Sequence, residues 1–61
     1  MRKNDILTVI EKQTNIVRDA KVVSCGKVLF TIEYLDSNLG TEKHYHRNIG
    51  DRYYLDFKLK D

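Results

Sequence analysis

The sequence predicts an α+β domain in which a short N-terminal helix packs on a four-stranded antiparallel β-meander. Residues 5–14 carry apolar side chains at helical spacing and begin beside an Asn and an Asp that suit a helix cap. After Asn15, short β-type runs alternate with glycine-containing turns, as in successive hairpins. A meander of this size can also curl towards a small barrel with the helix as its lid, and the sequence leaves both arrangements open.

The expected helix occupies residues 5–14, where the side chains at helical spacing are Ile6, Val9, Ile10 and Gln13. Asn15 can adopt the left-handed conformation that ends a helix. The same segment also suits a strand, because Ile6, Thr8 and Ile10 alternate and are β-branched. We predict the helix and keep the strand as the alternative.

Four strands are expected after the helix, at residues 17–24, 27–35, 41–48 and 52–60. Consecutive strands joined by short turns are antiparallel neighbours, so we expect residues 41–60 to form a C-terminal hairpin. Alternation along the strands and the helix predicts an inner layer of Val28, Phe30, Ile32, Tyr34, Leu55, Phe57, Leu59, Ile6 and Ile10.

Length and composition indicate one small domain spanning residues 1–61. The single cysteine, Cys25, excludes an internal disulfide. No apolar run reaches the roughly 18 residues of a membrane span, and residues 1–5 precede only a short apolar stretch without a cleavage-site pattern. We therefore expect a soluble, cytoplasmic protein. Reactive-thiol chemistry at Cys25 is not expected, because no histidine is near it in the sequence.

Two histidines, His44 and His46, lie two residues apart in an expected strand and so share one face. That spacing can offer two imidazoles to one metal ion, but no convincing third ligand accompanies them. We expect both to point outward, with Tyr45 and Ile49 turned inward, and we expect no metal and no cofactor.

Enzymatic activity is not expected either. Histidines near Lys, Arg and Tyr could serve acid–base chemistry on a phosphate, but a thin layer of helix and sheet offers little concavity. The sequence also contains no glycine-rich phosphate loop, nucleophile elbow or paired-carboxylate motif.

Positive charge is concentrated near the C-terminus, although the whole chain has a net charge of only +2. Residues 43–60 contain five Lys and Arg against two Asp, a local net charge of +3. Cations interleaved with aromatic rings suit phosphate neutralisation and base stacking on single-stranded RNA. The expected nucleic-acid-binding residues are Lys43, His44, His46, Arg47, Arg52, Tyr54, Lys58 and Lys60. The alternative is a solvated edge whose cations prevent aggregation.

Leu29 and Leu35 fall on the face of the second expected strand opposite its apolar set. Apolar side chains on an outward sheet face often mark a binding surface, and a chain this short gains stability by self-association. We expect a protein interface at these two residues, with a homodimer as the first expectation and another protein target as the alternative.

A very short chain without proline and rich in Lys, Asn, Ile and Tyr resembles, in size and composition alone, the small accessory proteins of phages and mobile elements. The expected function is therefore a non-enzymatic nucleic-acid-binding protein, preferably for RNA, with an accessory or inhibitory role. The alternative is an inhibitor or regulator that binds a host, toxin or defence protein without nucleic acid.

Overall fold

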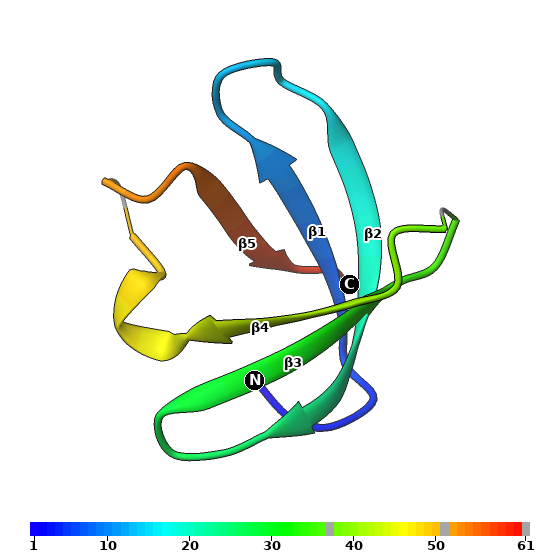
Figure 1. The fold of residues 1–61 in the computed structure, drawn as a ribbon, viewed down its shortest axis with the longest axis vertical. Helices are drawn as coiled ribbons and strands as arrows, with labels where there is room; N and C mark the ends of the chain where they lie inside the picture. The colour runs from blue at the N-terminus through cyan, green and yellow to red at the C-terminus, as the bar shows by residue number, and fades with distance from the viewer. Residues whose placement is uncertain (37, 51, 61) are drawn as a thin grey trace.

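The computed structural model describes residues 1–36, 38–50 and 52–60, and these form five antiparallel strands in one sheet (Figure 1). The elements are β1 (Ile6–Glu11), β2 (Val17–Cys25), β3 (Leu29–Tyr34), β4 (Thr41–Tyr45), the 3₁₀ turn η1 (His46–Asn48) and β5 (Leu55–Leu59). The strand order is β4-β3-β2-β1-β5, and the sheet curls into a half-barrel. Among the described residues, no helix is long and apolar enough to cross a membrane.

The expected helix at residues 5–14 is wrong, because most of this segment forms strand β1. β1 has a partner on each side, β2 and β5, so the sheet satisfies its backbone groups on both edges. Its side chains follow a period of two, with Leu7 and Val9 buried. Asn15 does adopt the left-handed conformation, at φ 60°, but in the turn that joins β1 to β2. Paired neighbours on both sides therefore outweigh the helical spacing of the apolar residues.

The expected C-terminal hairpin at residues 41–60 is also wrong. Strands β1 to β4 form a meander, but β5 pairs with β1 instead of β4. This pairing sets Leu55 opposite Glu11 and Phe57 opposite Val9, and it buries both β5 side chains in the core. The chain from residue 46 to residue 54 therefore carries β5 from one edge of the sheet to the other.

The curl of the sheet is centred on β2, the longest strand. β2 pairs with β1 through residues 17–21 and with β3 through residues 20–25. The register between β2 and β3 shifts between Val22 and Ser24, which is a β-bulge. A bulge bends the strand that holds it and increases the local twist. In Figure 1, β3 and β4 consequently run at a steep angle to β1.

The core lies on the concave face of the half-barrel. Its buried apolar residues are Leu7, Val9, Ala20, Val22, Phe30, Ile32, Tyr34, Leu55 and Phe57. Two residues expected there are exposed: Val28 at 62% and Leu59 at 58%. Val28 precedes β3 and lies in a turn, and Leu59 ends an edge strand that has a neighbour on one side only. Ile6 and Ile10, expected in the inner layer, are half-buried on the other face of β1.

The inward and outward faces of strand β4 are exchanged relative to the prediction. His44 is 5% exposed and is the one buried polar residue among those described, whereas Tyr45 and Ile49 are exposed. The register pairs His44 with Phe30, and directly paired residues share one face of a sheet. Gly40, at φ 74°, sets this register from the preceding turn, where its carbonyl accepts the Tyr34 N–H at 3.2 Å. A shift of one residue would have turned every β4 side chain over.

Core truncation tests this burial pattern. We expect Leu7→Ala to lower the free energy of unfolding by about 2–5 kcal/mol and Ile32→Val by about 0.5–1.5 kcal/mol. The matched control Leu59→Ala should change it by no more than about 0.5 kcal/mol, because Leu59 is exposed. Urea titration followed by circular dichroism measures all three, and an equal cost for Leu59 and Leu7 would contradict the assigned core.

Candidate nucleic-acid interface

His44 is held by hydrogen bonds at both ring nitrogens. Nε2 lies 3.3 Å from Oε1 of Glu42, and Nδ1 lies 3.0 Å from the hydroxyl of Tyr53. A carboxylate only accepts hydrogen bonds, so Nε2–H donates to Glu42. In the neutral ring Nδ1 is then an acceptor, and the Tyr53 hydroxyl donates to it. The Tyr34 hydroxyl donates to the same Glu42 oxygen at 2.6 Å.

The His44 ring also closes the open side of the half-barrel. Its centroid lies 5.0 Å from that of Phe57 on β5 and 5.8 Å from that of Phe30 on β3. Phe30 and Phe57 meet edge to face at 5.3 Å. β4 and β5 are the two edge strands of the sheet. Side chains therefore join these two strands, in addition to the turn that connects them.

The two tyrosines of this network are less acidic than an ordinary tyrosine. Burial is the main cause that raises the pKa of Tyr53 to about 12, and the neighbouring Tyr54 hydroxyl adds to the effect. A hydrogen bond from Asn48 opposes this rise in the Tyr53 pKa. Burial, followed by the hydrogen bond to Glu42, also raises the pKa of Tyr34. Both phenols therefore keep their protons, and act as donors, at neutral pH.

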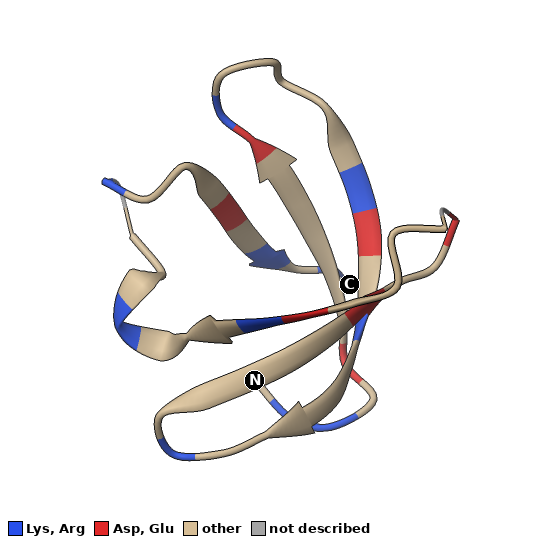
Figure 2. Ribbon diagram, viewed as in Figure 1, with Lys and Arg blue, Asp and Glu red and all other residues tan. Residues whose placement is uncertain are grey.

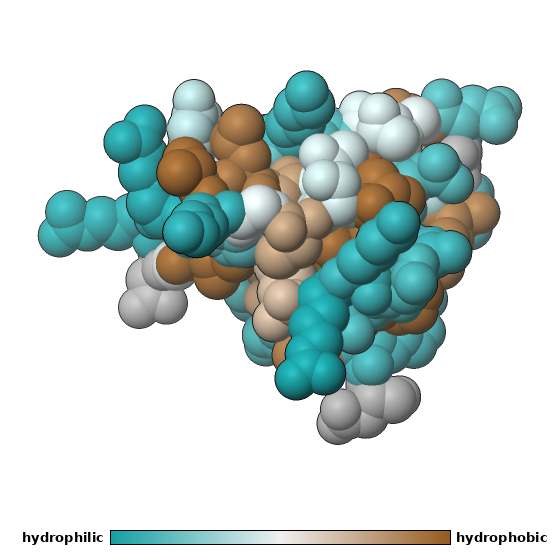
Figure 3. Space-filling view, turned by 90° about the horizontal axis from the view of Figure 1, so that it is seen from below, coloured by the Kyte–Doolittle hydropathy of each residue, from teal (hydrophilic) through white to brown (hydrophobic). Residues whose placement is uncertain are grey.

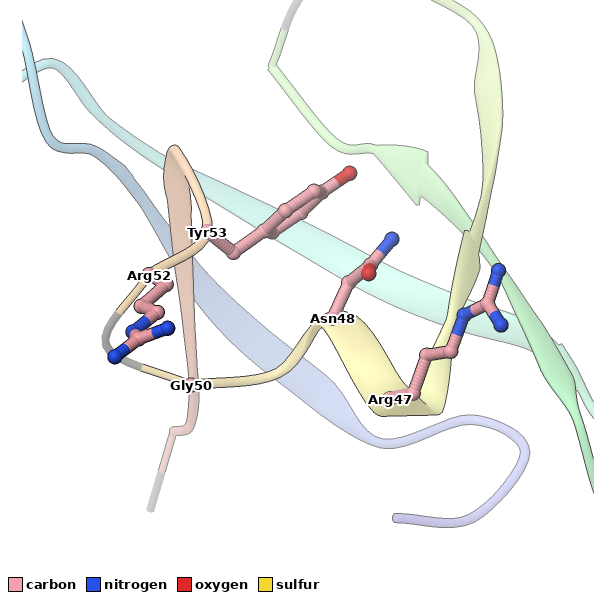
Figure 4. Close-up of a pocket in the computed structure, with 5 residues that line it drawn as sticks. All are labelled: Arg47, Asn48, Gly50, Arg52 and Tyr53. Atoms are coloured by element: carbon pink, nitrogen blue, oxygen red, sulfur yellow. The ribbon is translucent and has the colours of Figure 1, made fainter.

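The segment between β4 and β5 surrounds an open hollow of about 320 Å³, which we call the arginine hollow. It is lined by Arg47, Asn48, Gly50, Arg52 and Tyr53. Figure 4 shows the Asn48 and Tyr53 side chains between the two arginines, with Arg47 on one side and Arg52 on the other. The volume is at the lower end of the range for small-molecule sites.

Backbone hydrogen bonds fix this segment. The Ile49 N–H donates to the His46 carbonyl at 3.1 Å and the Tyr53 N–H to the Gly50 carbonyl at 3.3 Å. At the end of β1, the Lys12 N–H donates to the Tyr54 carbonyl at 3.0 Å. The guanidinium of Arg47 lies 4.7 Å from the centroid of the Tyr45 ring, a cation–π contact that restricts the arginine.

Positive charge dominates the described part of this segment. Arg47 and Arg52 are its only charged side chains there, and Figure 2 shows the Lys and Arg positions of the chain in blue. Asp51, which the sequence analysis counted against them, lies outside the described residues. The Lys12 ammonium reaches the same segment and donates to the Gly50 carbonyl at 3.1 Å. The hollow therefore combines two guanidinium groups, a lysine close by, an amide and an aromatic ring.

The structure distributes the eight expected nucleic-acid-binding residues over several places. Arg47 and Arg52 line the arginine hollow. Tyr54 is 56% exposed, with its ring centroid 4.6 Å from that of Tyr53.

Lys43 is exposed on β4, next to the buried His44. Lys58 lies 3.7 Å from Asp56 and Lys60 lies 2.6 Å from Asp19, so both ammonium groups have an acidic neighbour.

His44 is therefore not the outward-facing residue that the sequence suggested, and His46 is half-buried in η1. The His46 ring packs on Phe30 at 5.1 Å, and its Nε2–H donates to the Gly26 carbonyl at 2.8 Å. Both nitrogens of His44 bind protein groups, as described above. Among the described residues, no group of three or more His, Cys, Asp and Glu could hold a metal ion.

Cys25 has a histidine close by, contrary to the sequence analysis. Its Sγ lies 3.9 Å from Nε2 of His46, because the turn between β2 and β3 meets η1. That nitrogen donates its proton to the Gly26 carbonyl and has no lone pair left for the thiol proton. In this arrangement His46 cannot activate the Cys25 thiol as a base.

Leu29 and Leu35 are both exposed, but they lie at opposite ends of β3. Leu29 is directly opposite Tyr45 on β4, and Val28 precedes it. Leu35 follows β3 at the other end. Figure 3 shows that apolar surface, in brown, is divided into separate groups with hydrophilic side chains in teal around them. Because Leu29 and Leu35 lie at opposite ends of β3, they belong to two separate surfaces.

Sequence reasoning missed Gly50 and two side chains of the arginine hollow, Asn48 and Tyr53. Proximity to Arg47 and Arg52 in the sequence was the available signal for both. Glu42 was missed as the partner of His44, because the expected β4 face was reversed. No protein-family model, curated protein or solved structure matches the chain.

Substitution of Tyr53 tests the His44 network. We expect Tyr53→Phe to lower the free energy of unfolding at neutral pH by about 1–3 kcal/mol, because Nδ1 of the buried His44 loses its donor. The pKa of Tyr53 is raised to about 12 in the folded protein, from about 10 in an unfolded chain. The folded protein thus keeps a proton that the unfolded chain loses, and stability falls as the pH rises from about 10 to about 12.

Tyr53→Phe should make this alkaline loss of stability smaller. The control is Tyr45→Phe, which changes an exposed tyrosine outside the network. Chemical denaturation of the three proteins at a series of pH values from neutral to about 12 gives both quantities. If Tyr53→Phe has the stability and the alkaline pH dependence of the wild type, the network does not hold His44 in this way.

Proposed function

We propose that this chain is a non-enzymatic protein that binds single-stranded RNA through the arginine hollow. The observation that carries the proposal is the placement of Arg47 and Arg52 on opposite sides of Tyr53 in one open hollow. Such a protein would act by covering RNA, in an accessory or inhibitory role. Its free, exposed Cys25 suits the reducing cytoplasm, where we place it.

The two arginines suit binding to phosphate groups of a nucleic-acid strand. Guanidinium groups bind phosphate oxygens through several parallel donors, and they keep their charge at all physiological pH values. Arg47 and Arg52 lie on opposite sides of the hollow, so each can contact its own phosphate. The cation–π contact with Tyr45 restricts Arg47 before binding, which lowers the entropy that binding would cost.

Exposed aromatic rings beside these cations suit base stacking. Tyr54 is more than half exposed and lies against Tyr53. Single-stranded nucleic acid binds to grooves that combine cations with such rings, because every base has a face that can stack. A strand that follows the two arginines would bring its bases to this pair of tyrosines.

The salt dependence of RNA affinity separates phosphate contacts from base stacking. Each phosphate contact with a single strand contributes a slope of about −0.7 to log affinity against log salt. We therefore expect Arg47→Ala and Arg52→Ala each to flatten this slope by about 0.7. Tyr54→Ala should weaken binding by about 1–3 kcal/mol and leave the slope unchanged. Fluorescence anisotropy of a labelled oligouridine, measured from about 50 to about 200 mM salt, gives all these values.

The control for the arginines is Lys21→Ala, which removes a positive charge from β2 rather than from the arginine hollow. This variant should keep the wild-type slope. If the wild-type chain fails to bind oligouridine at low salt, or if Lys21→Ala flattens the slope as much as Arg52→Ala does, the proposed function is wrong.

Self-association is a second candidate function, favoured by the apolar group formed by Val28, Leu29 and Tyr45. All three are exposed, and the Leu29–Tyr45 pair lies at one end of edge strand β4. A chain of 61 residues buries little surface alone, so a second copy is the partner that we propose.

Sedimentation velocity tests this candidate. We expect the wild type to form dimers at micromolar concentration, and we expect Leu29→Glu to be a monomer with an unchanged circular dichroism spectrum. The control is Leu35→Glu, at the other end of β3, which should still form dimers. A wild type that is monomeric over a wide concentration range would contradict self-association.

A further inference from the structure

A second hollow, of about 210 Å³, opens at one end of the half-barrel, and we call it the mouth hollow. β1 and β3 end there, and β2, β4 and β5 begin there. Its floor is apolar, because Val9 and Leu55 belong to the buried core. The polar residues around it are Glu11, Arg18, Tyr34, Glu42 and Tyr54. Mouths of β-barrels with an apolar floor and a few converging polar groups are common ligand sites.

Strand register places three charged side chains in this hollow. Glu11 on β1 is paired with Leu55, Arg18 on β2 with Val9, and Glu42 on β4 with Ile32. All three apolar partners are buried, and directly paired residues share one face. The charged side chains therefore lie on the concave face, where a small β-sheet normally places apolar residues.

These groups retain hydrogen-bonding capacity for a ligand. Oε1 of Glu42 accepts from both Tyr34 and His44, which fixes the carboxylate and leaves its Oε2 for another donor. Among the described residues, neither Glu11 nor Arg18 forms an ion pair with another side chain. The mouth hollow therefore presents two carboxylates that accept and one guanidinium that donates.

The two hollows are neighbours. Tyr53 lines the arginine hollow, Tyr54 lines the mouth hollow, and their ring centroids are 4.6 Å apart. A hydrogen-bonded path also connects them, from Glu42 through His44 to Tyr53. A ligand with a phosphate in one hollow can therefore place an uncharged ring in the other.

We propose that the mouth hollow binds a guanine base of the RNA whose phosphates contact Arg47 and Arg52; this inference rests on the proposed function. Unpaired bases are recognised by stacking and by hydrogen bonds to their Watson–Crick edges. Guanine presents two adjacent donor groups there, N1–H and the 2-amino group, beside the acceptor O6. This pattern of two donors and one acceptor complements the two carboxylates and Arg18, with Tyr54 as the stacking ring.

The other bases fit this set of groups less well. Adenine and cytosine each carry a single amino donor beside a ring-nitrogen acceptor, and uracil has one N–H between two carbonyl acceptors. Each would leave a carboxylate without a donor, and unpaired buried polar groups weaken binding. A base is neutral, so its entry brings no phosphate charge close to Glu11 and Glu42. The phosphates remain on the arginine side of the tyrosine pair.

The experiment compares a short oligouridine with the same strand carrying one central guanosine, adenosine, cytidine or inosine, by fluorescence anisotropy at low salt. We expect the guanosine strand to bind the wild type roughly 5-fold to 150-fold more tightly than oligouridine. Inosine lacks the 2-amino group and should lose part of this gain. The adenosine and cytidine strands should bind within about 3-fold of oligouridine, since neither supplies the two adjacent donors.

Isosteric variants assign the preference to the mouth hollow. Glu42→Gln keeps an oxygen for Tyr34 and His44 but replaces the second acceptor with a donor, and Glu11→Gln makes the same change on β1. Each variant should lose most of the tighter binding of the guanosine strand without weakening the binding of oligouridine. The control is Glu33→Gln, an exposed carboxylate on β3, which should keep the full gain.

The outcomes separate this inference from the proposed function. Arg52→Ala should weaken all strands alike and leave the ratio between guanosine and uridine strands unchanged. The mouth hollow does not recognise guanine if all strands bind the wild type equally or if another base is preferred. The same follows if both glutamine variants still bind the guanosine strand more tightly than oligouridine. In each of these cases the proposed RNA binding is unaffected. If no strand binds at all, the proposed function fails, and the inference fails with it.

Discussion

The buried ring of His44 is the interaction on which the rest of this structure depends. The strand order leaves β4 and β5 at opposite edges of the sheet, so the two strands are not joined by backbone hydrogen bonds. The His44 ring fills the space between them, against Phe57 and Phe30, and both its nitrogens are hydrogen-bonded. A buried polar side chain with every partner in place fixes one arrangement, because any other leaves a polar group without a partner.

Both candidate binding sites depend on the hydrogen bonds of His44. Tyr53, which donates to His44, lines the arginine hollow. Glu42, which accepts from His44, is an acidic group of the mouth hollow. The same hydrogen bonds that hold the half-barrel together therefore orient one side chain in each hollow. Groups held in this way need little reordering when a ligand binds, which favours affinity.

Sequence patterns predicted those parts of the structure that depend on neighbours along the chain. Strand β2 and the alternation of Phe30, Ile32 and Tyr34 were predicted, since these residues are β-formers between turns. Segment 5–14 fits helix and strand spacing almost equally well, and only its two partner strands decide between them. Arg47 and Arg52 were predicted as binding residues from local charge, and they do line one hollow. The mouth hollow was not predicted, because it brings together residues from five strands.

By itself, the sequence predicted short β-strands after residue 15 and a concentration of cations and tyrosines towards the C-terminus, because composition and alternation are local properties. Only the tertiary structure decided that β5 returns to β1 and that β4 turns His44 inward. Register explains the difference. A strand shifted by one residue keeps all its local preferences but exchanges its two faces, so the choice rests on partners that are distant in sequence. For His44 those partners are Tyr53, Phe57 and Phe30, which no spacing along the chain identifies.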